Sequence, residues 1–286
     1  EMIIEMIQIG GGAALSGPVT WPLAANLIAR QQGNFKYSFM NLLKTSGVRV
    51  AFSGCLPYSS YKLCGIGIQR GVQTPVISYI NQYHQNMNES VKFGVSGLIS
   101  GLIGGLVVTP IEQFKISMAN GQFKNMQATK SYFLSNMTGV KALFSGAKIT
   151  ILRNMLYDSV NAILYNKAIK VSYIDKTNAT HMAIINACAG VLTAIIDYPL
   201  DVFKTRIQSH TIELYGASPP PSTLVNISSS SKNISILKLC RHMIQTEGIS
   251  SLYHGLESKL GLYFAVWFVY GIAYSTIGNA IIYAKR

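Results

Sequence analysis

The feature that most constrains the fold is an internal repeat. Three prolines lie 88 and 89 residues apart, and each follows an apolar segment rich in glycine and alanine: Pro22, Pro110 and Pro199. Recurrence at a fixed period indicates a chain built from repeated structural units. We therefore predict three repeats, spanning residues 1–88, 89–178 and 179–286.

A second marker divides each repeat in two. An aromatic residue, a variable residue and a glycine recur downstream of each proline, ending at Gly54, Gly146 and Gly255. A second long, mostly apolar segment follows each marker, so two spanning segments per repeat predict six transmembrane helices. In the third repeat, a polar Pro/Ser-rich insertion at about 215–232 precedes helical apolar spacing over Ile234–Thr246, which we expect to lie on the membrane surface.

Composition supports an all-α membrane protein. Only 12% of residues are charged and 49% are hydrophobic, whereas soluble domains carry about a quarter charged residues. Residues 6–29, 93–111 and 260–284 contain no Lys, Arg, Asp or Glu, and about 20 such residues cross a bilayer. The net charge of +13 comes from scattered Lys and Arg without a nucleic-acid-binding signature, so we expect anionic lipid or anionic solutes rather than nucleic acid as partners.

The other apolar segments contain charges. Lys62 and Arg70 fall in the second, Arg153 and Asp158 in the fourth, and Asp197 in the fifth. A charge inside a spanning helix costs roughly 2.5–3.5 kcal/mol and usually faces a wet interior. These residues therefore predict a cavity between the helices.

Metal, disulfide and catalytic signatures are missing from the sequence. The four cysteines show no CxxC spacing, and the five histidines form no HxxxH or HxH pair. No nucleophile, base and oxyanion arrangement is recognisable, so we expect neither an enzyme nor a cofactor. Glu1 and Glu5 precede the first apolar stretch, where a secretory signal would carry positive charge.

One polar helical face recurs in phase with the repeat. Asp201, Lys204 and Gln208 follow Pro199 at spacings that place them on one side of a helix. Alone, such a face could be a solvated surface with one intrahelical ion pair of about 0.2–0.5 kcal/mol. A second copy after Pro110, with an acid and a base at the same offsets, favours a functional role over that interpretation.

This pattern resembles the mitochondrial carrier family of solute transporters. Its repeat signature is Pro-X-acid-X-X-base, followed by acid-Gly and then aromatic-base-Gly. The third repeat resembles it strongly and the second well, but the first has Ala24 and Leu27 where the acid and base belong. The resemblance implies that Pro22, Pro110 and Pro199 kink the odd-numbered helices, whose charged faces then converge on the matrix side.

The resemblance implies a matrix gate made of ion pairs between repeats. Its residues would be Glu112, Lys115, Asp201, Lys204 and Gln208. Glu112 is expected to pair with Lys204, while Gln208 and Gln31 could brace such pairs. At the second gate of the family, near the ends of the even-numbered helices, the corresponding positions carry no ion pair.

Two gate charges lack their expected partners. Lys115 would have faced an acid in the first repeat, and Asp201 a base there. We expect both to remain unpaired or to turn to water, to each other, or to Asn26 and Arg30. A gate of three bridges would be reduced to one.

The resemblance places substrate contacts seven to eight residues after the marker glycines. The candidate substrate-binding residues are Tyr61, Lys62, Arg153, Asn154, Tyr263 and, one turn further on, Asp158. Two cations favour an anionic solute of nucleotide or carboxylate type. Asp158 is expected to pair with Lys62, with Arg153 or with a substrate cation, and an internal structural ion pair is an equal alternative.

The expected function is transport of a small anionic metabolite by alternating access. The alternative is a carrier-derived adaptor or receptor that has lost transport, which the eroded first repeat favours and the retained membrane charges oppose. The resemblance also implies a monomer in the mitochondrial inner membrane. Gly54, Gly146 and Gly255 resemble its cardiolipin sites, where backbone N–H groups meet lipid phosphate.

Overall fold

The computed structural model describes residues 2–31, 38–52, 54–119, 126–135, 137–171, 178–214 and 236–284. Within these ranges the chain forms α-helices, one 3₁₀ helix and no strand, which confirms the all-α prediction. The elements are α1 (Met2–Gln31), α2 (Phe39–Ala51), α3 (Cys55–Tyr83), α4 (Glu89–Ala119), α5 (Met126–Leu134), α6 (Met137–Leu143), α7 (Ala147–Ala168), α8 (Ala179–Leu214), α9 (Ile236–Glu247), the 3₁₀ helix (Ile249–Tyr253) and α10 (Leu256–Ala284).

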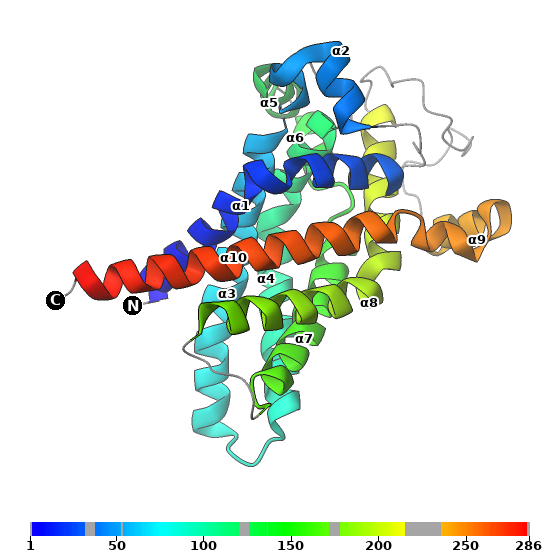
Figure 1. The fold of residues 1–286 in the computed structure, drawn as a ribbon. Helices are drawn as coiled ribbons and strands as arrows, with labels where there is room; N and C mark the ends of the chain where they lie inside the picture. The colour runs from blue at the N-terminus through cyan, green and yellow to red at the C-terminus, as the bar shows by residue number, and fades with distance from the viewer. Residues whose placement is uncertain are drawn as a thin grey trace.

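Six long helices form a ring. Helices α1, α3, α4, α7, α8 and α10 each contact the long helix before and after them along the chain, and α10 also contacts α1. The contact between α1 and α10 closes the ring and brings the N- and C-termini to the same side of the molecule (Figure 1). The shorter helices α2, α5, α6 and α9 come between the two long helices of a pair.

Two helices of the described chain are long and apolar enough to cross a membrane. These segments are Glu89–Met118 in α4 and Thr180–Gln208 in α8. The predicted surface segment of the third repeat corresponds to α9. The predicted insertion at 215–232 lies outside the described residues.

Asparagines cap the starts of α4 and α8. Asn88 Oδ1 accepts a hydrogen bond from the Ser90 backbone N–H at 2.9 Å, and Asn178 Oδ1 accepts one from the Thr180 N–H at the same distance. These side chains satisfy N–H groups that have no partner inside the first helical turn. The repeated prolines lie further along, inside α1, α4 and α8, which continue past them; the kinks themselves remain a prediction.

The marker glycines stand at the starts of the second long helix of each pair, which are α3, α7 and α10. Gly146 and Gly255 have φ values of +73° and +88°, a left-handed conformation that L-residues with side chains rarely adopt. Gly54 is required for a different reason, because a Cβ there would collide with the Trp21 ring. The aromatic-X-Gly marker thus terminates one segment and begins a long helix.

Close packing of α4 on α7 fixes one wall of the ring. A Cβ on Gly101 would lie 2.5 Å from Met155 Cα and 2.6 Å from the Asn154 carbonyl oxygen. Gly97 and Gly105 make similar approaches to the α7 backbone, as their four-residue spacing predicts. The position of the α7 backbone at Asn154 therefore depends on the absence of side chains on this face of α4.

Replacing Gly101 with alanine should destabilise the protein by about 1–3 kcal/mol, because the obstructing atoms belong to the α7 backbone and cannot rotate away. Thermal unfolding in detergent measures the effect. Gly261→Ala is the matched control, since a Cβ there meets nothing within 4 Å. Equal melting temperatures for Gly101→Ala and the wild type would contradict the close approach.

Candidate functional site

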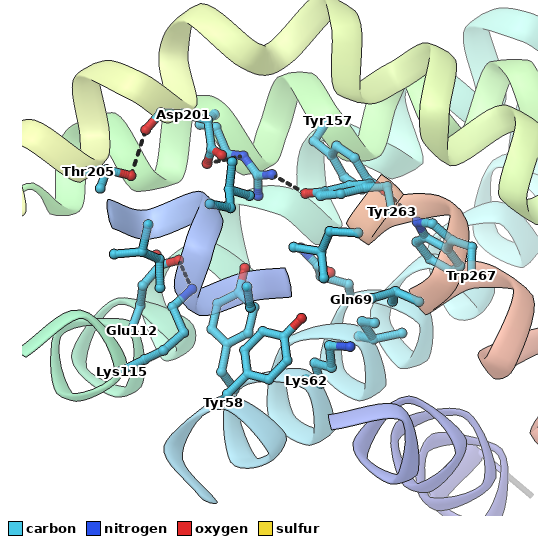
Figure 2. A pocket seen from close by; sticks show the side chains of 18 of the residues that line it. Tyr58, Lys62, Gln69, Glu112, Lys115, Tyr157, Asp201, Thr205, Tyr263 and Trp267 are labelled. Atoms are coloured by element: carbon cyan, nitrogen blue, oxygen red, sulfur yellow. Dashed lines mark hydrogen bonds and ion pairs between the residues drawn. The ribbon is translucent and has the colours of Figure 1, made fainter. Parts of the chain in front are cut away.

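The ring of long helices encloses a cavity to which all six contribute side chains (Figure 2). This agrees with the prediction from charges in the apolar segments. The charged residues that line it are Lys62, Arg70, Glu112, Lys115, Arg153, Asp158 and Asp201. Of the predicted substrate-binding residues, Tyr61 and Tyr263 line it as well, whereas Asn154 does not.

Glu112 joins two lysines at one end of the cavity. Its Oε2 lies 2.6 Å from Lys204 Nζ on α8, and its Oε1 lies 3.1 Å from Lys115 Nζ on α4. The structure thus brings together Glu112 and Lys204 from different repeats. The expectation that Lys115 is unpaired is wrong, because residues three apart on a helix share a face; Figure 2 shows Glu112 and Lys115 projecting together from α4.

A second cluster contains four charges from three helices. Arg153 of α7 and Lys259 of α10 surround Asp197 and Asp201, which lie one turn apart on α8. Asp197 accepts a hydrogen bond from Lys259 Nζ at 2.7 Å and lies 2.8 Å from Arg153 Nε in an ion pair, and Asp201 lies 3.5 Å from Arg153 Nε and 3.4 Å from Lys259 Nζ. We call these residues the four-charge cluster; its two cations balance its two carboxylates.

The expected partners of Asp201 in the first repeat are also wrong. Arg30 instead pairs with Glu257 at the surface, and Asn26 Oδ1 accepts the backbone N–H of Phe39 at 2.9 Å. Asp201 takes its hydrogen bond from Gln31, whose Nε2 lies 2.8 Å from Oδ2. The interaction joins the end of α1 to α8 and replaces the missing charge with an amide.

Asp197 and Lys259 were not predicted as site residues, although both side chains are 0% exposed. A signal for Asp197 was available, because it lies four residues before Asp201 and therefore on the same helical face. Two carboxylates on one buried face require more than one cation nearby. Lys259 supplies the second cation. It lies 62 residues after Asp197 in the sequence, on another helix, so the spacing of residues within one helix does not predict the contact.

Arg153 is fully engaged within the protein. Its Nε contacts Asp197, its Nη2 donates to Tyr263 Oη at 2.6 Å, and its Nη1 donates to Asn154 Oδ1 at 3.0 Å. The guanidinium also stacks 5.0 Å from the centre of the Tyr157 ring. Asn154 is 1% exposed, lies outside the cavity lining and orients Arg153 through this hydrogen bond. Its contact with a solute stays a prediction.

Lys62 has a different environment. Its Nζ donates to Ser16 Oγ at 2.8 Å and to Thr20 Oγ1 at 3.0 Å, and it lies 4.6 Å from the centre of the Tyr58 ring. No carboxylate in the described part of the chain lies within 4.0 Å of it, although its side chain is almost completely buried. Within the described chain this amine is therefore contacted by two hydroxyls and an aromatic ring and by no acid.

The comparison with known families agrees with this geometry. A model described as mitochondrial carrier protein matches residues 86–177 and 175–285. The chain belongs to the mitochondrial carrier family. The relatives that it matches are named as transporters or carriers, not as enzymes.

Curated relatives of this carrier differ in the solutes they are named for. A probable mitochondrial adenine nucleotide transporter of Arabidopsis thaliana is 26% identical over 158 residues, covering 54% of this chain and 32% of that protein. A chloroplastic/mitochondrial S-adenosylmethionine carrier of the same species is 30% identical over 105 residues, or 34% and 31% of the two chains. The mitochondrial glycine transporter of Homo sapiens is 28% identical over 113 residues, or 37% and 36%. The matches thus span about a third of each relative's length.

The remaining predicted residues of this carrier have mainly packing contacts. Gln208 Nε2 lies 3.3 Å from Thr150 Oγ1 on α7, so it braces α8 against α7 and not the Glu112 pair. A Cβ on Gly146 would approach the Gln208 side chain, and one on Gly255 would approach Tyr198 Oη. Packing alone explains these glycines, and their role in lipid binding remains a prediction.

Replacing Lys259 with methionine should lower stability by about 3–5 kcal/mol, because Arg153 alone would face two buried carboxylates. Thermal unfolding of the purified carrier measures the loss. Adding Asp201→Asn should recover part of it by restoring the charge balance, whereas Lys167→Met, at an exposed position of α7, should change little. A Lys259→Met protein as stable as the wild type would contradict the four-charge cluster.

Proposed function

We propose that this carrier moves a small anionic metabolite through the central cavity by alternating access. The observation that carries the proposal is Lys62, a buried ammonium without a carboxylate partner in the described chain, whose neighbours are neutral. Such a charge in a cavity supplies a strong hydrogen bond to a carboxylate or phosphate that enters it. No chemical step is involved.

The balance of charge around the cavity supports an anion. Six cations in and beside it stand against four carboxylates: Lys62, Arg70, Lys115, Arg153, Lys204 and Lys259 against Glu112, Asp158, Asp197 and Asp201. The four-charge cluster is neutral, and Glu112 is shared by two lysines. Lys115 extends from that pair over the Tyr61 ring at 4.2 Å and toward the Tyr58 ring, which Lys62 also approaches.

The architecture we propose is six membrane-spanning helices in three repeats. The closed ring of six long helices supports it, as do the starts of α4 and α8 next to the proposed boundaries at 88/89 and 178/179. In this arrangement, the Glu112–Lys204 pair and the four-charge cluster close the matrix end. The proposed setting is a monomer in the mitochondrial inner membrane, with cardiolipin at the marker glycines.

The substrate is proposed to be of nucleotide or carboxylate type. Tyr58, Tyr61 and Tyr263 offer aromatic surfaces near the cations, which suit a base or another flat group. Relatives named for adenine nucleotides support the first class.

Ala24 and Leu27, at the eroded positions, are buried in an apolar cluster, so the first repeat closes by packing where it lacks ion pairs. A non-transporting adaptor is the alternative that the next experiment excludes or supports.

Uptake into proteoliposomes tests this function with labelled adenine nucleotides, phosphate, dicarboxylates and amino acids. We expect uptake of at least one compound that carries a carboxylate or phosphate, and Lys62→Gln should lower its apparent affinity about tenfold or more by removing a charged hydrogen-bond donor. Lys167→Gln, which removes an exposed lysine outside the cavity, should behave like the wild type. No uptake of any compound by protein with a cooperative melting transition would favour the adaptor.

A further inference from the structure

Asp158 is the one cavity-lining carboxylate of the described chain without a cation within 4.0 Å. Its Oδ2 is buried and has no hydrogen-bond partner. Glu112 and Asp201, by contrast, each meet two cations. An unpaired carboxylate in a spanning helix is costly, so its retention needs a reason.

The cations that could neutralise Asp158 are engaged elsewhere. Lys62 is held by Ser16 and Thr20 of α1, and Arg153 is held by the four-charge cluster. An internal ion pair of Asp158 with Lys62 or Arg153 is therefore not formed.

Arg70, a third cation in the cavity lining, donates its hydrogen bonds to two amides. Its Nη1 donates to Gln73 Oε1 and its Nη2 to Asn161 Oδ1, both at 2.9 Å. Asn161 lies three residues after Asp158 on the same face of α7, so Arg70 reaches across to the helix of Asp158 and stops one turn away. The carboxylate thus faces the cavity with its charge uncompensated by any direct partner.

The charges are arranged in levels along the cavity. Lys62 lies eight residues after its marker glycine and Asp158 lies twelve after its own, a difference of one helical turn or about 6 Å. Arg70 lies about one further turn away. Lys62 thus lies nearer the Glu112–Lys204 end of the cavity, and Asp158 lies one turn further from that end. Together they present opposite charges to a solute of a few atoms' length.

We propose that Asp158 binds the cationic group of a zwitterionic substrate, whose carboxylate or phosphate binds Lys62. The proposal rests on the function proposed above, because both use the same cavity. The neighbouring aromatic residues fit an ammonium as well: Tyr157 precedes Asp158, Trp267 Nε1 donates to Tyr157 Oη at 3.1 Å, and Tyr263 packs edge-on against the Tyr157 ring. Aromatic faces attract cations and would surround the amine on the side away from α4.

The substrate class is accordingly a small metabolite with a protonated amine and an anionic group separated by a few bonds. A purely anionic solute would place negative charge beside Asp158 and leave that carboxylate uncompensated. A cation without an anionic group would face the uncompensated Lys62. The two sites together therefore select for both charges in one molecule.

Proteoliposome uptake tests the proposal with two sets of probes. One set carries an amine: glycine, lysine, γ-aminobutyrate and S-adenosylmethionine. The other is purely anionic: succinate, phosphate and ATP. We expect uptake of at least one amine-bearing probe, a loss of about tenfold or more in its apparent affinity on Asp158→Asn, and recovery in Asp158→Glu.

The controls separate binding from folding. Glu89→Gln removes an exposed carboxylate at the start of α4, paired with Lys170 at the surface, and should leave uptake unchanged. Melting curves of all variants establish that they fold. Succinate or phosphate uptake, where present, should not fall in Asp158→Asn.

Five results would overturn the proposal. Equal losses for amine-bearing and purely anionic probes in Asp158→Asn would indicate a structural carboxylate, and unchanged uptake of the amines would remove its role. If anion uptake by the wild type depends on a pH gradient and Asp158→Asn abolishes that dependence, Asp158 carries a proton instead. Uptake of anions alone by the wild type would refute the zwitterion while leaving the proposed function intact, whereas no uptake of any probe by folded protein would refute both.

Discussion

The cost of placing charge in an apolar environment governs the interior of this carrier. A buried ion pair is tolerated only when its geometry is good, and removing one partner leaves an expensive unpaired charge. The four-charge cluster meets this condition by setting Arg153 and Lys259 around two carboxylates one turn apart on α8. Because these charges satisfy one another, the uncompensated ones, above all Lys62 and Asp158, mark where a solute would interact.

The eroded first repeat changes how the ring is held together. Ala24 and Leu27 join the apolar core, so these two positions of α1 contribute no ion pair to the closed end. Gln31 substitutes for the missing charge by donating to Asp201 and accepting from Thr205 Oγ1 at 2.9 Å. Charges thus link α4, α7, α8 and α10 in the interior, whereas α1 meets α8 through the hydrogen bonds of Gln31 and through packing, and its ion pair with α10, Arg30–Glu257, lies at the surface.

Features that depend on local spacing were predictable from the sequence. The helical class, the cavity and the close packing at Gly101 follow from apolar segments, charges within them and glycine spacing. The approach of Glu112 to Lys204 followed from the family resemblance. The partners of Asp201 did not, because Lys259 belongs to another helix and its direction depends on how α10 packs on α8. The hydrogen bond that Asn154 accepts from Arg153 was likewise not predictable from the spacing of the motifs.

Cysteine accessibility in liposomes measures whether the Glu112–Lys204 pair closes one end of the cavity. With the native cysteines replaced, a charged, membrane-impermeant thiol reagent should label Gln73→Cys in the cavity lining from one side of the membrane only. Adding Glu112→Gln should open the other end and make Gln73→Cys reactive from both sides. Labelling of Gln73→Cys from both sides with the ion pair intact, or its protection from both sides, would contradict closure by this pair.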